Sequence, residues 1–224
     1  MSRKLIPYMV RTGTRRNLDA ARRLRWRLLV SAAGVWRTED FEGWAADNGQ
    51  WSERNNPGPF KADRFKRFVA WCMAQATPPD WIALPDIVMG GARSLALTMK
   101  WLRWFRSTGL ADRVRLLIVV QDGMDTGPML ERIKVQLGDR VGIFVGGSTE
   151  WKHSTKAFWA ALAGEHGAYC HVGRVNSAKR ARECDIIGAH SFDGSGPSRF
   201  EKCLHQVDAA FDQPDLEGHI RRAA

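Results

Sequence analysis

Three aspartates stand where apolar segments of the sequence give way to turns. Asp47 lies in ADNGQW, Asp86 follows WIALP, and Asp193 follows HSF. Two carboxylates in different environments can supply a nucleophile and a proton shuttle, as in enzymes that break a glycosidic bond through a covalent intermediate. The pattern indicates carboxylate chemistry, although an aspartate after a strand is also a common N-cap of the next helix.

Other polar and glycine residues in similar places would complete a binding site for a purine. Gln121 follows LLIVV, and Gly146 and Gly147 follow GIFV. Guanine presents donors at N1 and N2, which carboxylates accept, and an acceptor at O6, which an amide or a backbone N–H can serve. The two glycines are equally explained by a turn. We interpret Asp122, next to Gln121, as the cap of the helix that follows.

The elements that must position these residues alternate along the chain. Short runs rich in Val, Ile and Leu are separated by longer amphipathic stretches, which predicts a parallel sheet covered by helices. The predicted strands span residues 5–10, 27–31, 81–84, 115–120, 141–145, 168–172 and 184–187, the last with an extension to 192. The predicted helices span residues 18–24, 63–74, 92–105, 128–137, 154–163, 178–182 and 197–211.

Two ways of closing such a sheet compete. An open, doubly wound sheet usually carries GxGxxG after its first strand, but this turn reads RTGTRRN. A barrel gathers functional residues at the C-terminal ends of several strands, which fits the aspartates above. We therefore predict an α/β fold of the TIM-type (β/α) barrel class. It should be compact or incomplete, because 224 residues are few for eight full units of this fold, which typically needs about 250.

The domain organisation is predicted to be simple. Residues 1–212 form one barrel domain, and residues 213–224 form a polar tail. The longest irregular stretch, residues 42–59, contains DNGQW and NNPGP and is typical of a functional loop. We see no internal repeat and no linker.

Charge and composition indicate a polyanionic partner and exclude several other classes of protein. The net charge is +10, and the first 27 residues hold nine Arg and Lys against one acid, Asp19. The alternative explanation is that the positive charge only keeps the protein molecules dispersed in solution. There is no apolar run long enough to span a membrane and no signal-peptide pattern, so we expect a cytoplasmic protein, in the host cytoplasm if the chain is viral. The four cysteines form no CxxC pair, and we expect no metal and no cofactor.

Taken together, the polar segments resemble the queuine/archaeosine tRNA-guanine transglycosylase superfamily, most closely its phage-type DNA-guanine transglycosylases. The most specific match is YCHVGRVNSAKRARECDIIGAHSFDGSGPSRF, which is similar to the family's strand, Gly-rich turn, short helix and final strand running into FD–P–(S/T)R. ADNGQW resembles the D-S/N-G motif, IVVQDG the VQGG-type stretch, and LPDIV and IFVGGST the base-binding segments. The motifs follow the family order from about Asp47 to Arg199.

The resemblance implies a function and a role for each residue. The enzyme would exchange guanine in DNA for a free 7-deazaguanine base, such as 7-cyano-7-deazaguanine, through a covalent aspartyl-nucleoside intermediate. Asp193 would be the nucleophile and Asp47 the proton shuttle, and the base would be bound by Asp86, Gln121, Gly146, Gly147 and Asn48. The expected phosphate partners are Arg15, Arg16, Arg174 and Arg199, although each could equally be a solvated surface charge.

The chain also departs from the family pattern. It has no Cys/His cluster for the zinc subdomain of the tRNA enzymes, and His190 stands where relatives usually carry an acid. We interpret His171 and His190 as packed or hydrogen-bonded side chains, with a metal site through both as the alternative. Two other functions stay open, a tRNA-guanine transglycosylase without the zinc subdomain and a non-catalytic, nucleic-acid-binding barrel subunit. A homodimer also stays open.

Overall fold

The protein is a closed barrel of eight parallel strands in sequence order. The computed structural model describes residues 5–11, 14–53 and 60–210, so the predicted tail 213–224 lies outside the described residues. Each strand pairs in parallel with the next, and β8 closes on β1, which confirms the predicted TIM-type barrel. The strands are β1 (Ile6–Val10), β2 (Arg27–Ser31), β3 (Trp44–Asp47), β4 (Trp81–Ala83), β5 (Arg115–Val120), β6 (Val141–Val145), β7 (Cys170–Val172) and β8 (Ser191–Gly194).

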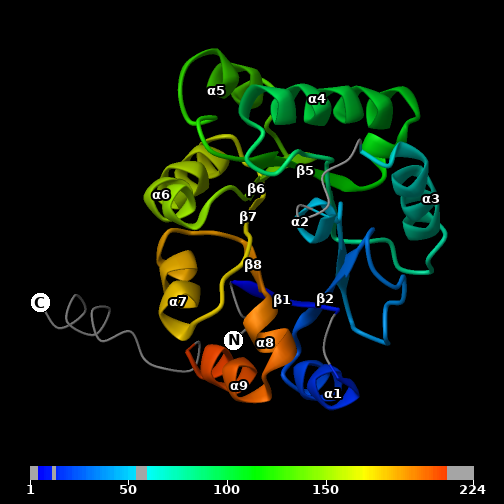
Figure 1. Ribbon diagram of the computed structural model, residues 1–224, viewed down its shortest axis with the longest axis vertical. Coiled ribbons are helices and arrows are strands. Elements are labelled where there is room, and N and C mark those ends of the chain that lie inside the picture. Colours follow the sequence, from blue (N-terminus) through cyan, green and yellow to red (C-terminus); the bar gives the residue numbers. More distant parts are fainter. Residues whose placement is uncertain (1–4, 12–13, 54–59, 211–224) are drawn as a thin grey trace, which may run out of the picture.

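Helices surround the strands on the outside of the barrel (Figure 1). No helix of the described part is long and apolar enough to cross a membrane. The α-helices are α1 (Arg15–Arg23), α2 (Gln50–Glu53), α3 (Ala62–Met73), α4 (Gly91–Ser107), α5 (Gly127–Lys134), α6 (Thr149–Glu165), α7 (Ala178–Ile186), α8 (Ser195–Arg199) and α9 (Glu201–Ala209).

The barrel lacks one helix, as its short length predicts. Residues 32–43, which connect β2 to β3, contain no helix. In its place the Trp36 ring packs on Phe68 and Trp71 of α3, with ring centroids 5.3 Å and 6.1 Å away. The Trp36 indole also donates a hydrogen bond to the Ala32 carbonyl at 3.3 Å. The loop therefore covers the outside of β2 and β3 with an aromatic side chain instead of a helix.

The middle of β5 is apolar because both of its faces are buried. Leu117 and Val119 belong to the cluster inside the barrel, whereas Leu116, Ile118 and Val120 pack in the outer cluster against the helices. This alternation with a period of two is the geometry of a strand, and the covered faces explain the unbroken apolar run LLIVV after Arg115.

Several elements differ from the sequence prediction. β3 and α2 both lie in the segment that was predicted to be irregular. The strand signal of β3 is weak, because WAAD is short, holds two alanines and ends in an aspartate. The predicted strand at 184–187 is the end of α7, where Ile186 is 81% exposed and Gly188 reverses the chain at φ +76°. The single helix predicted at 197–211 is two helices, since Phe200 between them is extended, with φ −128° and ψ 110°.

Candidate functional site

A cavity of about 490 Å³ opens at the C-terminal ends of the strands. Asp47 is the last residue of β3, Asp193 lies in β8, and Gln121 directly follows β5. The fold thus brings every predicted catalytic and base-binding residue to one cavity. Those lining it are Asp47, Asn48, Asp86, Gln121, Gly146, Gly147 and Asp193.

Aromatic rings close the barrel below the cavity. Phe144 lines the cavity, and its ring centroid lies 4.5 Å from that of His171. The rings of Trp81 and Tyr8 lie 4.6 Å and 5.9 Å from His171 on other sides. Such close packing fills the barrel interior, so the cavity has an apolar floor and a polar wall.

Asp193 is held through one of its two carboxylate oxygens. Its Oδ1 accepts a hydrogen bond from His171 Nε2 at 3.0 Å and another from the backbone N–H of Arg174 at 3.3 Å. Among the described residues no side chain or backbone group donates to Oδ2. Asp193 is 6% exposed and lines the cavity, so its second oxygen is the atom available to a bound molecule.

Asp47 lines the same cavity from the end of β3, and the charge of Asp193 acts on it. Its Oδ2 accepts the backbone N–H of Gly49 at 2.9 Å. Burial raises the pKa of Asp47 to about 6; the Gly49 hydrogen bond opposes the rise, and the negative charge of Asp193 adds to it. A pKa near 6 lets this carboxyl exchange a proton at physiological pH.

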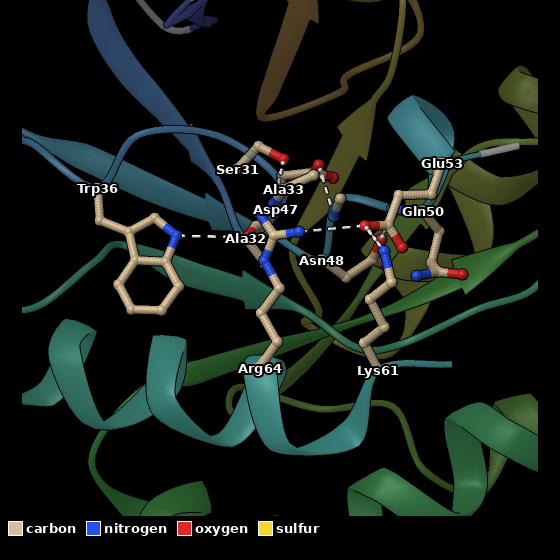
Figure 2. A network of polar contacts seen from close by, with 11 residues as sticks. Ser31, Ala32, Ala33, Trp36, Asp47, Asn48, Gln50, Glu53, Lys61 and Arg64 are labelled. Carbon is tan, nitrogen blue, oxygen red and sulfur yellow. Dashed lines mark hydrogen bonds and ion pairs between the residues drawn. The ribbon is translucent and has the colours of Figure 1, made fainter. Parts of the chain in front are cut away.

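Gly49 itself is required by the backbone that follows Asp47. Its φ is +83°, and a Cβ there would come within 2.7 Å of the Ala33 backbone nitrogen. Beyond it, Glu53 of α2 pairs with Lys61 and Arg64 at 2.9 Å and 3.2 Å, which ties the short helix to α3 (Figure 2). The sequence DNGQW is therefore a turn that fixes Asp47 and Asn48 at the end of β3.

Asp86 is buried in a network of amides. Asn48 donates to its Oδ1 at 2.8 Å and to the Leu84 carbonyl at 2.7 Å, and Gln121 donates to its Oδ2. Burial raises the pKa of Asp86 to about 7; the Asn48 and Gln121 hydrogen bonds oppose the rise, and the charge of Asp47 adds to it. The same amides that were predicted to bind a base thus orient the predicted base-reading carboxyl.

The glycine pair after β6 makes room for neighbouring side chains. Gly147 has φ +73°, and a Cβ would lie 2.7 Å from both Asp122 Oδ2 and the Trp151 ring. The Gly146 N–H is already donated to the Val120 carbonyl at 3.0 Å, so this residue contributes space and not a free donor.

The predicted role of Asp122 as the cap of its own following helix is wrong. Its carboxylate accepts the Ser148 backbone N–H at 2.8 Å and the Ser148 hydroxyl at 2.6 Å. Ser148 is itself the N-cap of α6. Asp122 therefore fixes the loop that holds Gly147 at the cavity, because the turn after β5 is close to the turn after β6.

Two of the four predicted phosphate-binding arginines reach the cavity. Arg174 and Arg199 line it, and the Arg174 guanidinium lies 3.9 Å above the centroid of the Trp51 ring. Arg15 and Arg16 lie outside the cavity lining, exposed in the first turn of α1, where Arg16 pairs with Glu201 at 2.6 Å. These two residues could contact only a ligand that extends beyond the cavity.

The two histidines are hydrogen-bonded, as interpreted from the sequence. His171 contacts Ser191 and Asp193 inside the barrel. His190 accepts the Cys170 backbone N–H at 3.1 Å through Nδ1 and stacks on Tyr169 at 4.8 Å. Within the described ranges no group of three or more His, Cys, Asp or Glu could hold a metal.

Sequence reasoning missed Lys152 and Trp51. Lys152 of α6 is 4% exposed and donates to the Gly173 carbonyl beside Asp193. Burial lowers the pKa of Lys152 to about 7, and the charge of Arg174 acts in the same direction. A signal existed: Lys152, Thr155 and Trp159 recur at helical spacing on one buried face.

Comparisons with known proteins identify the fold and no more. No protein-family model matches the chain, and no curated protein matches it. Solved structures with a similar fold include a citrate lyase from Burkholderia xenovorans LB400 (13% identity, TM-score 0.54, covering 97% of this chain and 79% of that one). RipC from Yersinia pestis is similar at 11% identity (TM-score 0.53, covering 96% and 98%).

The tryptophan synthase A-subunit from Pyrococcus furiosus is similar at 12% identity, with a TM-score of 0.55 over 93% of this chain and 96% of that one. The likeness spans nearly the whole chain, which agrees with the closed barrel described above. At these identities the likeness shows a shared architecture. Function has to be argued from the cavity itself.

Proposed function

We propose that this protein is a guanine transglycosylase that exchanges guanine in DNA for a 7-deazaguanine base. The observation that carries the proposal is the placement of Asp47 and Asp193 in one cavity, close enough for the charge of Asp193 to raise the pKa of Asp47. The two carboxyls have different surroundings, which suits a nucleophile paired with a proton shuttle.

The proposed reaction proceeds in two displacements at C1′ of the target nucleoside. The free oxygen of Asp193 forms a bond to C1′ while the bond from C1′ to N9 of guanine breaks and its electron pair passes to N9. Asp47 in its protonated form delivers the proton that guanine needs to leave. The incoming 7-deazaguanine then gives its N9 proton to ionised Asp47 and attacks C1′, which releases Asp193.

The other side of the cavity is suited to recognising the base. Asp86, with its raised pKa, lies with Asn48 and Gln121 in a buried network that can present acceptors to N1 and N2 of guanine. A site built from fixed polar groups discriminates well, because a base lacking the matching groups leaves buried partners unsatisfied. Gly146 and Gly147 line the cavity as well, so a bound base would meet their backbone and no side chain of theirs.

The rim on one side of the cavity is suited to a phosphate backbone. α7 and α1, which lie on either side of α8 and α9 in Figure 1, have no acid in their first turns. These first turns hold Lys179 and Arg180 in α7 and Arg15 and Arg16 in α1. Because cations at a helix N-terminus oppose the helix dipole, their clustering there favours an external anion as partner. Arg174 and Arg199 add two further basic residues at the cavity itself.

The test is exchange of labelled base into nucleic acid. Duplex DNA and tRNA are each incubated with the protein and radiolabelled guanine or 7-cyano-7-deazaguanine, beside the Asp193→Asn variant. We expect incorporation into DNA by the wild type alone. Incorporation only into tRNA would make the protein a tRNA-guanine transglycosylase. Binding of nucleic acid with no exchange into either would make it a non-catalytic subunit.

A further inference from the structure

A buried histidine behind the cavity has no part in the reaction above. His171 is fully buried in β7, behind Asp193 and away from the cavity lining. Its Nε2 lies 3.0 Å from Asp193 Oδ1, and its Nδ1 lies 2.8 Å from the hydroxyl of Ser191. We propose that His171 is a positioning residue that turns the Asp193 carboxylate so that one oxygen is held and the other faces the substrate. This inference rests on the proposed function, because it assigns Asp193 as the nucleophile.

The contacts define a single protonation form of the ring. An ionised carboxylate only accepts hydrogen bonds, so Nε2 must carry the hydrogen that points at Asp193. In a neutral ring Nδ1 is then an acceptor, and the Ser191 hydroxyl donates to it. Burial lowers the pKa of His171 against the opposing effect of Asp193, which agrees with a neutral ring. The Asp193 carboxylate thus fixes the tautomer, and the Ser191 hydroxyl, which can donate or accept, supports it by donating to Nδ1.

The surroundings keep the imidazole in place. The rings of Tyr8, Trp81 and Phe144 contact it, and Ser191 and Asp193 come from the neighbouring strand β8. From α6, Lys152 is the charged group that acts on both His171 and Asp193. With the ring fixed on several sides, its hydrogen bond has one direction. A carboxylate aligned in this way needs less reorganisation to attack C1′.

Two substitutions separate the hydrogen bond from the packing. His171→Gln keeps an N–H at the position of Nε2, whereas His171→Leu fills the space without a donor. We expect His171→Leu to slow formation of the covalent adduct by about 100-fold with little change in DNA affinity. We expect His171→Gln to restore the rate to within about tenfold of the wild type. His166→Leu, at the exposed C-terminal end of α6, is the matched control and should leave the rate unchanged.

Rescue by His171→Gln distinguishes positioning from general damage to the core, because only this variant keeps a donor to Oδ1. Equal rates for His171→Leu and the wild type would overturn the inference. An equal loss of rate in His171→Leu and His171→Gln, with melting temperatures that match the wild type, would also overturn the inference.

A spectroscopic test does not depend on the reaction. The nitrogen-15 resonances of the His171 ring, assigned by comparison with the His171→Gln spectrum, should show the neutral Nε2–H tautomer from pH 6 to pH 8. A charged ring or the Nδ1–H tautomer at pH 7 would contradict the proposed arrangement. Failure of the wild type to exchange bases in DNA and tRNA would instead refute the proposed function and leave this spectrum unaffected.

Discussion

The two sides of the cavity hold their carboxylates in opposite ways. On the β7–β8 side, Asp193 is bound through Oδ1 alone, by His171 and a backbone N–H. On the β3–β5 side, Asp86 is bound through both oxygens by the amides of Asn48 and Gln121. A carboxylate with a free oxygen can attack the substrate, whereas a carboxylate bound by amides at both oxygens can only shape the site and select the base. The difference suggests that the β7–β8 side supplies the nucleophile, whereas the β3–β5 side recognises the base and supplies the proton shuttle Asp47 at the end of β3.

The largest effect should come from Asp193. Asp193→Asn keeps the size of the side chain and removes the nucleophilic oxygen, so adduct formation and base exchange should fall on the order of 10⁴-fold. The adduct is measured as a band shift on a denaturing gel after incubation with DNA. Nucleic-acid binding should persist. An adduct that still forms in this variant would remove Asp193 as the nucleophile and undo the comparison.

Asp47 should have the next largest effect, and a defined pH dependence. With its pKa raised to about 6, Asp47 is ionised above that pH and can accept the N9 proton of the incoming base. Attack by the incoming base should therefore decline as the pH falls below about 6, whereas departure of guanine, which needs protonated Asp47, should decline above it. Asp47→Asn should lower the rate by about 10²- to 10³-fold and remove the limb on the acid side. The profile of kcat/KM from pH 5 to pH 8 is the measurement, and an unchanged limb would assign it to another group.

Asp86 should affect selection more than rate. Asp86→Ala should weaken discrimination between guanine and adenine by about 1–3 kcal/mol for each lost paired contact. Competition between the two labelled bases for incorporation measures this directly. An unaltered base preference would show that Asp86 does not distinguish the bases. Another residue on the β3–β5 side would then have to do so.

Asp86 should also make the stability of the protein depend on pH. Because its pKa is raised to about 7 in the folded state, the folded protein holds this proton more tightly than the unfolded chain does. Its contribution is fully present below about pH 4 and is lost as the pH rises through about 7. The melting temperature of the wild type should fall over this window more than that of Asp86→Asn. Parallel curves would contradict the raised pKa.

The smallest expected effect lies at the basic rim on the reacting side. Arg199→Ala should lower DNA affinity a few-fold and reduce the slope of log affinity against log salt by about 1 if one phosphate contact is lost. Arg103→Ala on the exposed face of α4 is the matched control, since Arg103 does not line the cavity. Fluorescence polarisation with duplex DNA at several salt concentrations measures both. Identical slopes in the two variants would place the DNA elsewhere.

Much of this arrangement could be predicted from the sequence, because a parallel barrel places the residue after each strand at the same end. That rule brings Asp86, Gln121 and Asp193 together, whereas Asp47 was assigned to the site by the family resemblance. It could not show that β3 is a strand, since two alanines and an aspartate carry little strand signal. The sequence also could not show hydrogen bonds between residues that are distant along the chain. Those of Asp122 with Ser148 and of His171 with Asp193 form only when neighbouring strands pair.

The missing helix between β2 and β3 has a consequence for how the cavity can adapt. β3 is covered outside partly by a loop, and its register with β4 comprises one pair, Ala46 with Ile82. We expect this seam to open first, so the amide protons of residues 44–47 should exchange with solvent faster than those of β5. Asp47 would then lie on the strand that moves most easily, which lets the cavity widen for an incoming base that is bulkier than the one it replaces.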